Sequence, residues 1–411
     1  MRKPVLTIFY QFDPWQSSIG GIQTVARNFI KFAPDDIALR LVGIESTADG
    51  PVGRWQRREL GGRTVDFLPL FRRVDDDRRH WIPTSLRYAL GLRRSSLTPK
   101  LASDFMHFHR LEASLLTRLW PGHKTLFVHN DIHQQMRSAA VQGILWRRLP
   151  GLYFALEGWL LPQFDRVLSC NSESTALYQQ RYPRLADRIS FVRNSVDEEV
   201  FFPISAIDRQ QRRVQQARRL RLPDDTQFLL FAGRLHPQKD PLLLLQSLAL
   251  TTDPRAHLLV AGDGELAAAL ADERDRLGLE RRVTLLGSLN QAALADLHRL
   301  ASAFVLTSAY EGFPLVVLEA LACGTPVVTT AAGETPRLLQ PDAGLVCGDR
   351  APATIAAAWD RVLHHPDQFP SSACTANARP YSARTVIEGI YEDMLRPWRE
   401  SDRRPAERVY N

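Results

Sequence analysis

Two glutamates eight residues apart, Glu311 and Glu319, are the side chains of this sequence best placed for chemistry. Glu311 falls in a predicted loop, whereas Glu319 falls within an apolar run. A carboxylate in a buried segment is costly unless it is paired or hydrogen-bonded. Together the two carboxylates offer acceptors for sugar hydroxyl groups. The alternative is that Glu319 is a surface residue and that Glu311 caps a helix.

The elements around these glutamates form a strand, a loop, a helix and a second strand. The run 304–307 predicts a buried strand, Pro314 is expected as the first helical residue, and 315–322 predicts a short buried helix. Gly324 and Pro326 end that helix before a strand at 327–329. Ligands of open α/β sheets bind at the carboxyl ends of the strands. Gly312 would let a ligand approach, and the free N–H groups of the helix's first turn suit a phosphate.

The wider segment resembles a known family. Glu311 and Glu319 look like the E-x7-E signature of glycosyltransferase family 4, and EGFPLVVLEALACGTPVV follows the family pattern almost throughout. The resemblance continues in Gly233-Arg234-Leu235 with Lys239, in Gly262-Asp263-Gly264 and in Asn194-Ser195-Val196-Asp197. It is strong over residues 190 to 345 and weaker before them. Family members are retaining, nucleotide-sugar-dependent enzymes of the GT-B fold.

The resemblance implies an α/β fold with two Rossmann-like domains facing each other across a cleft, and a last helix that crosses back. We expect an acceptor-side domain at 1–196, a nucleotide-sugar-binding domain at 197–380, the crossing helix at 381–396 and a tail at 397–411. Apolar runs predict strands at 5–10, 37–42, 105–109, 125–129, 166–170, 227–232, 258–261 and 282–286. Residues 205–222 predict a solvated helix. Asp263 is expected to cap the helix that begins just after residue 263.

Donor-binding residues follow from the same resemblance. Arg234 and Lys239, the two cations of the loop at 233–240, can give charge-assisted hydrogen bonds to a diphosphate; the alternative is a pair of surface cations. The resemblance implies that Glu311 orients the transferred sugar as a catalytic residue and that Glu319 binds the ribose. The further donor-binding residues that it implies are Leu289 near the base, with Gly312, Phe313, Pro314 and Leu315.

The first half supplies a glycine pair and a histidine. Gly20 and Gly21 lie between a strand and a helix, either as a donor-binding loop, as the resemblance implies, or as a plain tight turn. His129 ends a predicted strand and matches the family's catalytic histidine beside the sugar, with His133 as the second candidate. His107 and His109 share one face of a strand. Their spacing resembles no zinc pattern, so we expect neither a metal nor a cofactor apart from the donor.

The composition limits the classes of binding partner but does not identify one. The chain has 411 residues, 45% of them apolar, and a net charge of +7, which favours a nucleotide, a nucleic acid or a membrane surface. Arginines and aromatic residues gather at 72–94 and 146–161, either as a surface for anionic headgroups or as a solvated face over a core helix. No recognised motif supports nucleic-acid binding. No transmembrane run is present, and four scattered cysteines fit a reducing cytoplasm.

The sequence therefore predicts a hexosyltransferase at the inner face of the cell membrane. It would move mannose or glucose from a UDP-sugar or GDP-mannose to a saccharide or polyprenyl-linked acceptor, in exopolysaccharide or lipopolysaccharide synthesis. Two alternatives stay open. A GT-B sugar-nucleotide epimerase would share the phosphate site, and a non-catalytic sugar-nucleotide-binding protein would bind the donor without turnover.

Overall fold

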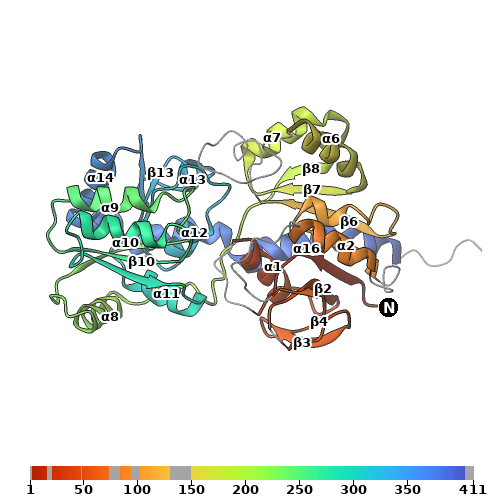
Figure 1. The fold of residues 1–411 in the computed structure, drawn as a ribbon, viewed down its shortest axis with the longest axis horizontal. Coiled ribbons are helices and arrows are strands. Elements are labelled where there is room, and N and C mark those ends of the chain that lie inside the picture. The colour runs from red at the N-terminus through yellow and green to blue at the C-terminus, as the bar shows by residue number, and fades with distance from the viewer. Residues whose placement is uncertain are drawn as a thin grey trace, which may run out of the picture.

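The computed structural model describes residues 2–15, 21–47, 49–73, 84–94, 101–129 and 150–402. They form two α/β domains that lie side by side, each built on one sheet with helices on both of its faces (Figure 1). Within this part of the chain, no helix is both long and apolar enough to cross a membrane.

The first domain is built on an eight-stranded sheet with the order β3-β4-β2-β1-β5-β6-β7-β8. Its strands are β1 (Val5–Phe9), β2 (Ala38–Glu45), β3 (Gln56–Leu60), β4 (Arg63–Arg72), β5 (Phe105–Phe108), β6 (His123–Val128), β7 (Arg166–Ser169) and β8 (Ile189–Phe191). Its helices are α1 (Gly21–Lys31), α2 (Thr84–Arg94), α6 (Pro150–Leu160) and α7 (Ser172–Arg181). All neighbours pair in parallel except β3 with β4, which form an antiparallel hairpin.

The second domain is built on a six-stranded parallel sheet with the order β11-β10-β9-β12-β13-β14. Its strands are β9 (Gln227–Ala232), β10 (Ala256–Ala261), β11 (Val283–Gly287), β12 (Ala303–Leu306), β13 (Val327–Thr330) and β14 (Gly344–Cys347). Its helices are α8 (Ala206–Arg219), α9 (Pro241–Leu250), α10 (Ala267–Arg276), α11 (Gln291–Leu300), α12 (Leu315–Ala322), α13 (Thr335–Leu338), α14 (Pro352–His364) and α15 (Ser371–Ala378). The strand order reverses between β9 and β12, the place where such sheets bind ligands.

The last helix, α16 (Ala383–Asp402), crosses back onto the first domain, as the GT-B resemblance predicts (Figure 1). Its Tyr391 is buried and donates a 2.6 Å hydrogen bond to the carbonyl of Phe29 in α1. The two crossings between the domains lie side by side, because Val196 donates to the Tyr381 carbonyl and Ala383 donates to the Val196 carbonyl. Glu198 binds the hydroxyl of Ser382 and the backbone N–H of Ala383.

Several local predictions differ from the structure. Pro314 precedes α12 as its N-cap and is not its first helical residue. Asp263 does not cap α10, since its carboxylate accepts from the N–H of Gly264 and α10 begins only at Ala267. Tyr88 is not an interfacial ring, because it is fully buried and donates to the carbonyl of Val42.

Helix α8 is not fully solvated either. Arg209 binds the carbonyls of Ala301, Cys323 and Gly324, and Arg213 binds that of Leu300. Carbonyls at the C-terminal ends of helices lack intrahelical partners, so guanidinium groups are favourable there. These two arginines hold α8 against the ends of α11 and α12.

Candidate functional site

The centre of the candidate site is an ion pair between the two loops that follow β9 and β12. Lys239 Nζ lies 2.5 Å from Glu311 Oε1, and the hydroxyl of Ser308 donates to the same carboxylate oxygen. Glu311 is only 5% exposed. Because β9 and β12 are neighbours at the reversal of strand order, the two side chains meet at the carboxyl edge of the sheet.

The loop from Glu311 to Pro314 is held from both domains. Asn171, the N-cap of α7 in the first domain, donates to the carbonyl of Gly312, and Asn194 donates to that of Phe313. Gly333 packs under the loop with φ of 59°, where a Cβ would lie 2.5 Å from the carbonyl oxygens of Glu311 and Gly312. Only glycine allows this approach, so the loop backbone is held by Asn171, Asn194 and the close packing of Gly333.

A second contact between the domains lies beside that loop. The buried carboxylate of Glu334 accepts from the backbone N–H of Ser172 at 2.5 Å and from its hydroxyl at 2.6 Å. A carboxylate at the N-terminus of α7 is favoured there by the helix dipole. Glu334 N–H in turn donates to the Gly312 carbonyl, so this contact and the Glu311 loop are one unit.

Glu319 lies inside α12 and is 6% exposed. Its Oε2 atom is buried and has no hydrogen-bond partner among the described residues. Burial raises the pKa of this carboxyl to about 8. A buried oxygen without a partner is costly in a folded protein, and a ligand hydroxyl would supply the missing bond.

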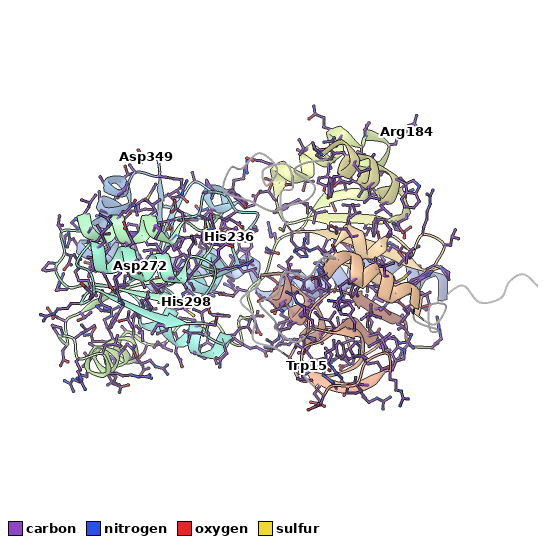
Figure 2. The ribbon with its side chains drawn as sticks, viewed as in Figure 1. Trp15, Arg184, His236, Asp272, His298 and Asp349 are labelled. Atoms are coloured by element: carbon purple, nitrogen blue, oxygen red, sulfur yellow. The ribbon has the colours of Figure 1, made fainter. Side chains whose placement is uncertain are left out.

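Arg234 is exposed at the cleft-side end of β9, and no ion-pair partner is found for it among the described residues. Its neighbour His236 lies on the face of the second domain that is turned toward the first, as Figure 2 shows. The structure thus brings Lys239 to Glu311 but leaves Arg234 open to solvent, where it is available to an anion.

Gly21, at the start of α1 in the first domain, lies against the first residue of α12. A Cβ on Gly21 would come within 3.5 Å of Leu315 Cδ1. Gly21, Leu315 and the Glu311 loop are therefore brought together across the domain boundary. Gly20 and His133 lie outside the described residues. Leu289 is half-buried and packs against the core of the second domain.

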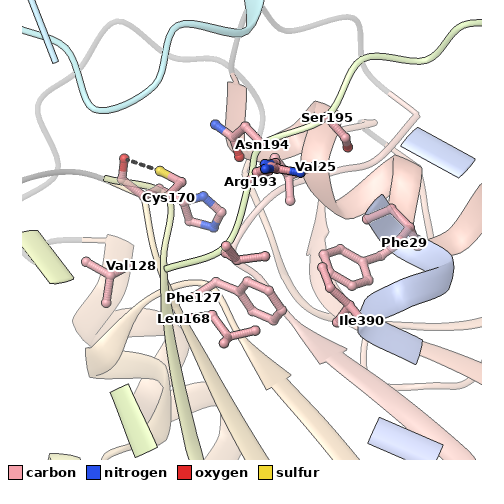
Figure 3. Close-up of a pocket in the computed structure, with 13 residues that line it drawn as sticks. Val25, Phe29, Phe127, Val128, Leu168, Cys170, Arg193, Asn194, Ser195 and Ile390 are labelled. Carbon is pink, nitrogen blue, oxygen red and sulfur yellow. Dashed lines mark hydrogen bonds between the residues drawn. The ribbon is translucent and has the colours of Figure 1, made fainter. Parts of the chain in front are cut away.

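His129 follows β6 at the cleft side of the first domain and is partly exposed. It lines a narrow pocket with Cys170, Arg193 and Asn194 (Figure 3), which has room for roughly one water molecule. Cys170 Sγ lies 3.4 Å from the carbonyl oxygen of His129 and donates to it. Burial, and then the neighbouring His109 and the positive charge of Arg110, hold the pKa of His129 well below its usual range.

Sequence reasoning assigned no role at this site to four residues that support it from neighbouring elements. They are His109 beside His129, Asn171 and Glu334 at the domain contact, and Arg193 at the pocket rim. His109 could have been found, because it sits on the strand next to β6 and ends it at the same edge. Asn171 and Glu334 become visible only when the domains are placed together, and Arg193 only when the first domain is packed with α16.

Comparison with known sequences finds a family match in the second domain. Residues 213–379, about two fifths of the chain, match the family model described as "Glycosyl transferases group 1". A D-inositol 3-phosphate glycosyltransferase of Frankia alni is 36% identical over 213 residues, which cover 49% of this chain and 51% of that protein. A glycogen synthase of Mycobacterium tuberculosis is 33% identical over 250 residues, covering 59% and 55%. The chain spans about half the length of these curated relatives.

Comparison with solved structures covers nearly the whole chain. Sucrose-phosphate synthase from Thermosynechococcus elongatus superimposes with a TM-score of 0.76 at 19% identity, over 97% of this chain and 99% of that one. Anabaena HepE in complex with UDP and glucose gives 0.71 at 16% identity, over 96% and 100%. WaaG, a glycosyltransferase involved in lipopolysaccharide biosynthesis, gives 0.71 at 16%, over 95% and 99%. The fold of the whole chain is therefore the two-domain GT-B fold.

Proposed function

We propose that the protein is a retaining glycosyltransferase that moves a hexose from a nucleoside-diphosphate sugar to a saccharide acceptor. The observation that carries the proposal is the buried Lys239–Glu311 pair, which faces the N-terminus of α12 at the reversal of strand order. A cation, a carboxylate and free helix N–H groups at one edge fit a sugar diphosphate, in which an anion adjoins hydroxyl groups.

The leaving nucleoside diphosphate develops negative charge on its phosphates. Arg234, Lys239 and the N–H groups at the start of α12 would stabilise that charge where it forms. Glu311 would orient the sugar hydroxyls, Glu319 the ribose hydroxyls, and His129 would bind the sugar from the opposite domain. Because these groups come from both domains, the reacting atoms are held in place only in the assembled cleft.

The proposed reaction needs no metal, since the protein's own cations would neutralise the diphosphate. Activity should therefore persist in the presence of a chelator, and its loss would assign the phosphate charge to a metal ion. UDP-glucose is the first donor to test, because the neighbour HepE was solved in complexes with UDP and glucose and with UDP-glucose. Mannose from GDP-mannose is the next candidate.

The proposed acceptor is a saccharide carried on a polyprenyl lipid, for exopolysaccharide or lipopolysaccharide synthesis at the inner face of the cell membrane. One surface of the first domain supports this part of the proposal. Leu152 and Trp159 lie on the same face of α6 and are 57% and 49% exposed, and the neighbouring Leu119 is 95% exposed. The guanidinium of Arg118 lies over the Trp159 ring, so apolar and cationic groups adjoin as at a membrane interface.

The test of the function is a donor panel without acceptor. UDP-glucose, UDP-galactose, UDP-N-acetylglucosamine and GDP-mannose would each be examined by thermal shift and by release of the nucleoside diphosphate. We expect one donor to raise the melting temperature and to be hydrolysed slowly, and added saccharide acceptors to speed release. Conversion of a donor into its epimer, or binding without any turnover, would contradict the proposal.

A further inference from the structure

Two histidines from neighbouring strands of the first domain share a hydrogen bond. Nδ1 of His109, which follows β5, lies 2.8 Å from Nε2 of His129, which follows β6. The two rings are nearly parallel, with 12° between their planes. Because β5 and β6 pair directly, the two residues are presented at the same edge of the sheet.

His109 is 2% exposed and stacks on Phe127, and the ring of Tyr10 meets its edge. Burial lowers the pKa of His109 to about 3, and the pKa of His129 also lies well below its usual range. In the part of the chain that the structure describes, the titratable or charged groups around the pair are Tyr10, His107, Arg110, Cys170 and Arg193, and none of these neighbours is a carboxylate. Both rings are therefore neutral at physiological pH, and each carries one N–H.

The surroundings of His109 decide where its hydrogen lies. Its other nitrogen, Nε2, is buried and has no hydrogen-bond partner among the described residues. Orphaned N–H donors are rarer in folded proteins than orphaned acceptors, so this Nε2 carries the lone pair. The hydrogen is then on Nδ1 of His109 and is donated to Nε2 of His129. In a neutral ring only one nitrogen is protonated, so the hydrogen of His129 is on Nδ1.

We propose that His109 is a positioning residue that fixes His129 in one orientation with Nδ1–H as the only ring group left to a substrate. His129 then donates a hydrogen bond to an oxygen of the transferred sugar and does not act as a base. The backbone of His129 is held as well, since Cys170 donates from N–H to the Val128 carbonyl and from Sγ to the His129 carbonyl (Figure 3). The role in catalysis rests on the proposed function, whereas the tautomer does not.

The direct test is the tautomer of His129, read from long-range ¹H–¹⁵N correlations of protein labelled at histidine. The His129 signals are assigned from their loss in His129→Gln. We expect the Nδ1–H form in the wild type between pH 6 and 8. His109→Phe keeps a ring in place but removes the donor, and it should shift His129 toward the Nε2–H form that free histidine prefers.

His107→Phe is the matched control. His107 lies on the same strand and face as His109, is equally buried and packs against Phe29 and Phe127. Among the described residues no hydrogen bond joins its ring to His129, so this variant should keep the Nδ1–H signal. His109→Asn, whose amide can replace the Nδ1–H donor, should restore it. An Nε2–H form in the wild type, or the same change in His107→Phe as in His109→Phe, would overturn the proposal.

Kinetics then separate positioning from simple stability. Once the donor is known, His109→Phe should lower kcat about 10²-fold with little change in KM, and His109→Asn should recover most of the loss. His107→Phe should stay within twofold of the wild type. An Nδ1–H tautomer in a protein that turns over no donor would contradict the proposed function but leave the positioning of His129 intact.

Discussion

Lys239 and Glu311 form an ion pair, with 2.5 Å between Nζ and Oε1. Each was assigned to a different part of the donor, the lysine to the diphosphate and the glutamate to the sugar. Because the two groups contact each other, a phosphate that binds as proposed would compete with Glu311 for the lysine, which would couple sugar orientation to phosphate binding.

Glu311→Gln should lower the transfer rate at least 10²-fold, because the sugar loses its charged acceptor. The substitution should not weaken binding of the nucleoside diphosphate. Its affinity should stay the same or increase, since Lys239 is released from its partner. Calorimetry with the nucleoside diphosphate, beside steady-state kinetics, gives both values. Glu265→Gln, at an exposed carboxylate of a neighbouring loop, is the control. Equal losses in rate and affinity would refute the sugar-orienting role.

Arg234→Ala should weaken diphosphate binding about tenfold to a hundredfold, the equivalent of one charge-assisted hydrogen bond of ~1.5–3 kcal/mol. Binding of the nucleoside alone should not change. Arg276→Ala is the control, because Arg276 is exposed and pairs with Glu273 on its own helix. Affinities for the nucleoside and for the nucleoside diphosphate, measured side by side, show whether Arg234 binds the diphosphate. An unchanged diphosphate affinity would mean that Arg234 is not part of the site.

Glu319 should release a proton when nucleotide binds. Burial raises its pKa to about 8, so the carboxyl is mostly protonated at pH 7. Hydrogen bonds from ribose hydroxyls favour the ionised form and lower that pKa. The binding enthalpy at pH 7 should then depend on the ionisation enthalpy of the buffer, with release of up to about one proton. Glu319→Gln should abolish this dependence, and a wild type without it would place the ribose elsewhere.

The protein should lose stability as the pH falls below about 6.5. His298 is fully buried, and burial lowers its pKa to about 3. The unfolded chain then binds more protons than the folded one between these pH values. The free energy of unfolding falls by about 1.4 kcal/mol per pH unit for such a histidine. Urea unfolding at pH 7.5, 6.5 and 5.5 measures the slope. His298→Phe should reduce it by one proton, whereas the exposed His365→Gln should not.

Trp159→Ser together with Leu152→Ser should reduce sedimentation with anionic vesicles, because the exposed apolar face of α6 would be removed. Leu250→Ser, at a residue of the second domain that is 53% exposed, controls for general loss of surface hydrophobicity. Vesicle binding that survives the double substitution but responds to salt would place the membrane contact on the arginines of another surface. Equal effects of all three changes would indicate non-specific adsorption.

Strands β9 to β13 of the second domain could be predicted closely, whereas the first domain could be predicted only in part. Glycine and proline lie at the ends of the elements between β12 and β13, so the boundaries of these elements can be predicted from the sequence. The hairpin of β3 and β4 went unnoticed because Gln56–Leu60 is polar and largely exposed, and Pro69 interrupts the apolar run of β4. Short-range pattern carries no sign of either strand.

The candidate site, too, could be predicted only in part. Individual residues such as Glu311 and Lys239 could be selected from the sequence, but not their contact, which depends on β9 lying beside β12. The bond between His109 and His129 likewise requires the pairing of β5 with β6. Asn171 and Glu334 belong to the site only through the packing of one domain on the other. Local sequence patterns do not predict how distant segments pair.

The return of α16 has a consequence for how the chain folds during synthesis. Ile387, Tyr391, Met394 and Leu395 are buried in the completed structure, and Tyr391 binds the carbonyl of Phe29. The first domain therefore lacks part of its core until α16 has been made. The second domain, continuous in sequence, can fold meanwhile. Synthesis order and folding order are thus reversed, and a chain that stops before α16 would present an uncovered apolar surface to chaperones and proteases.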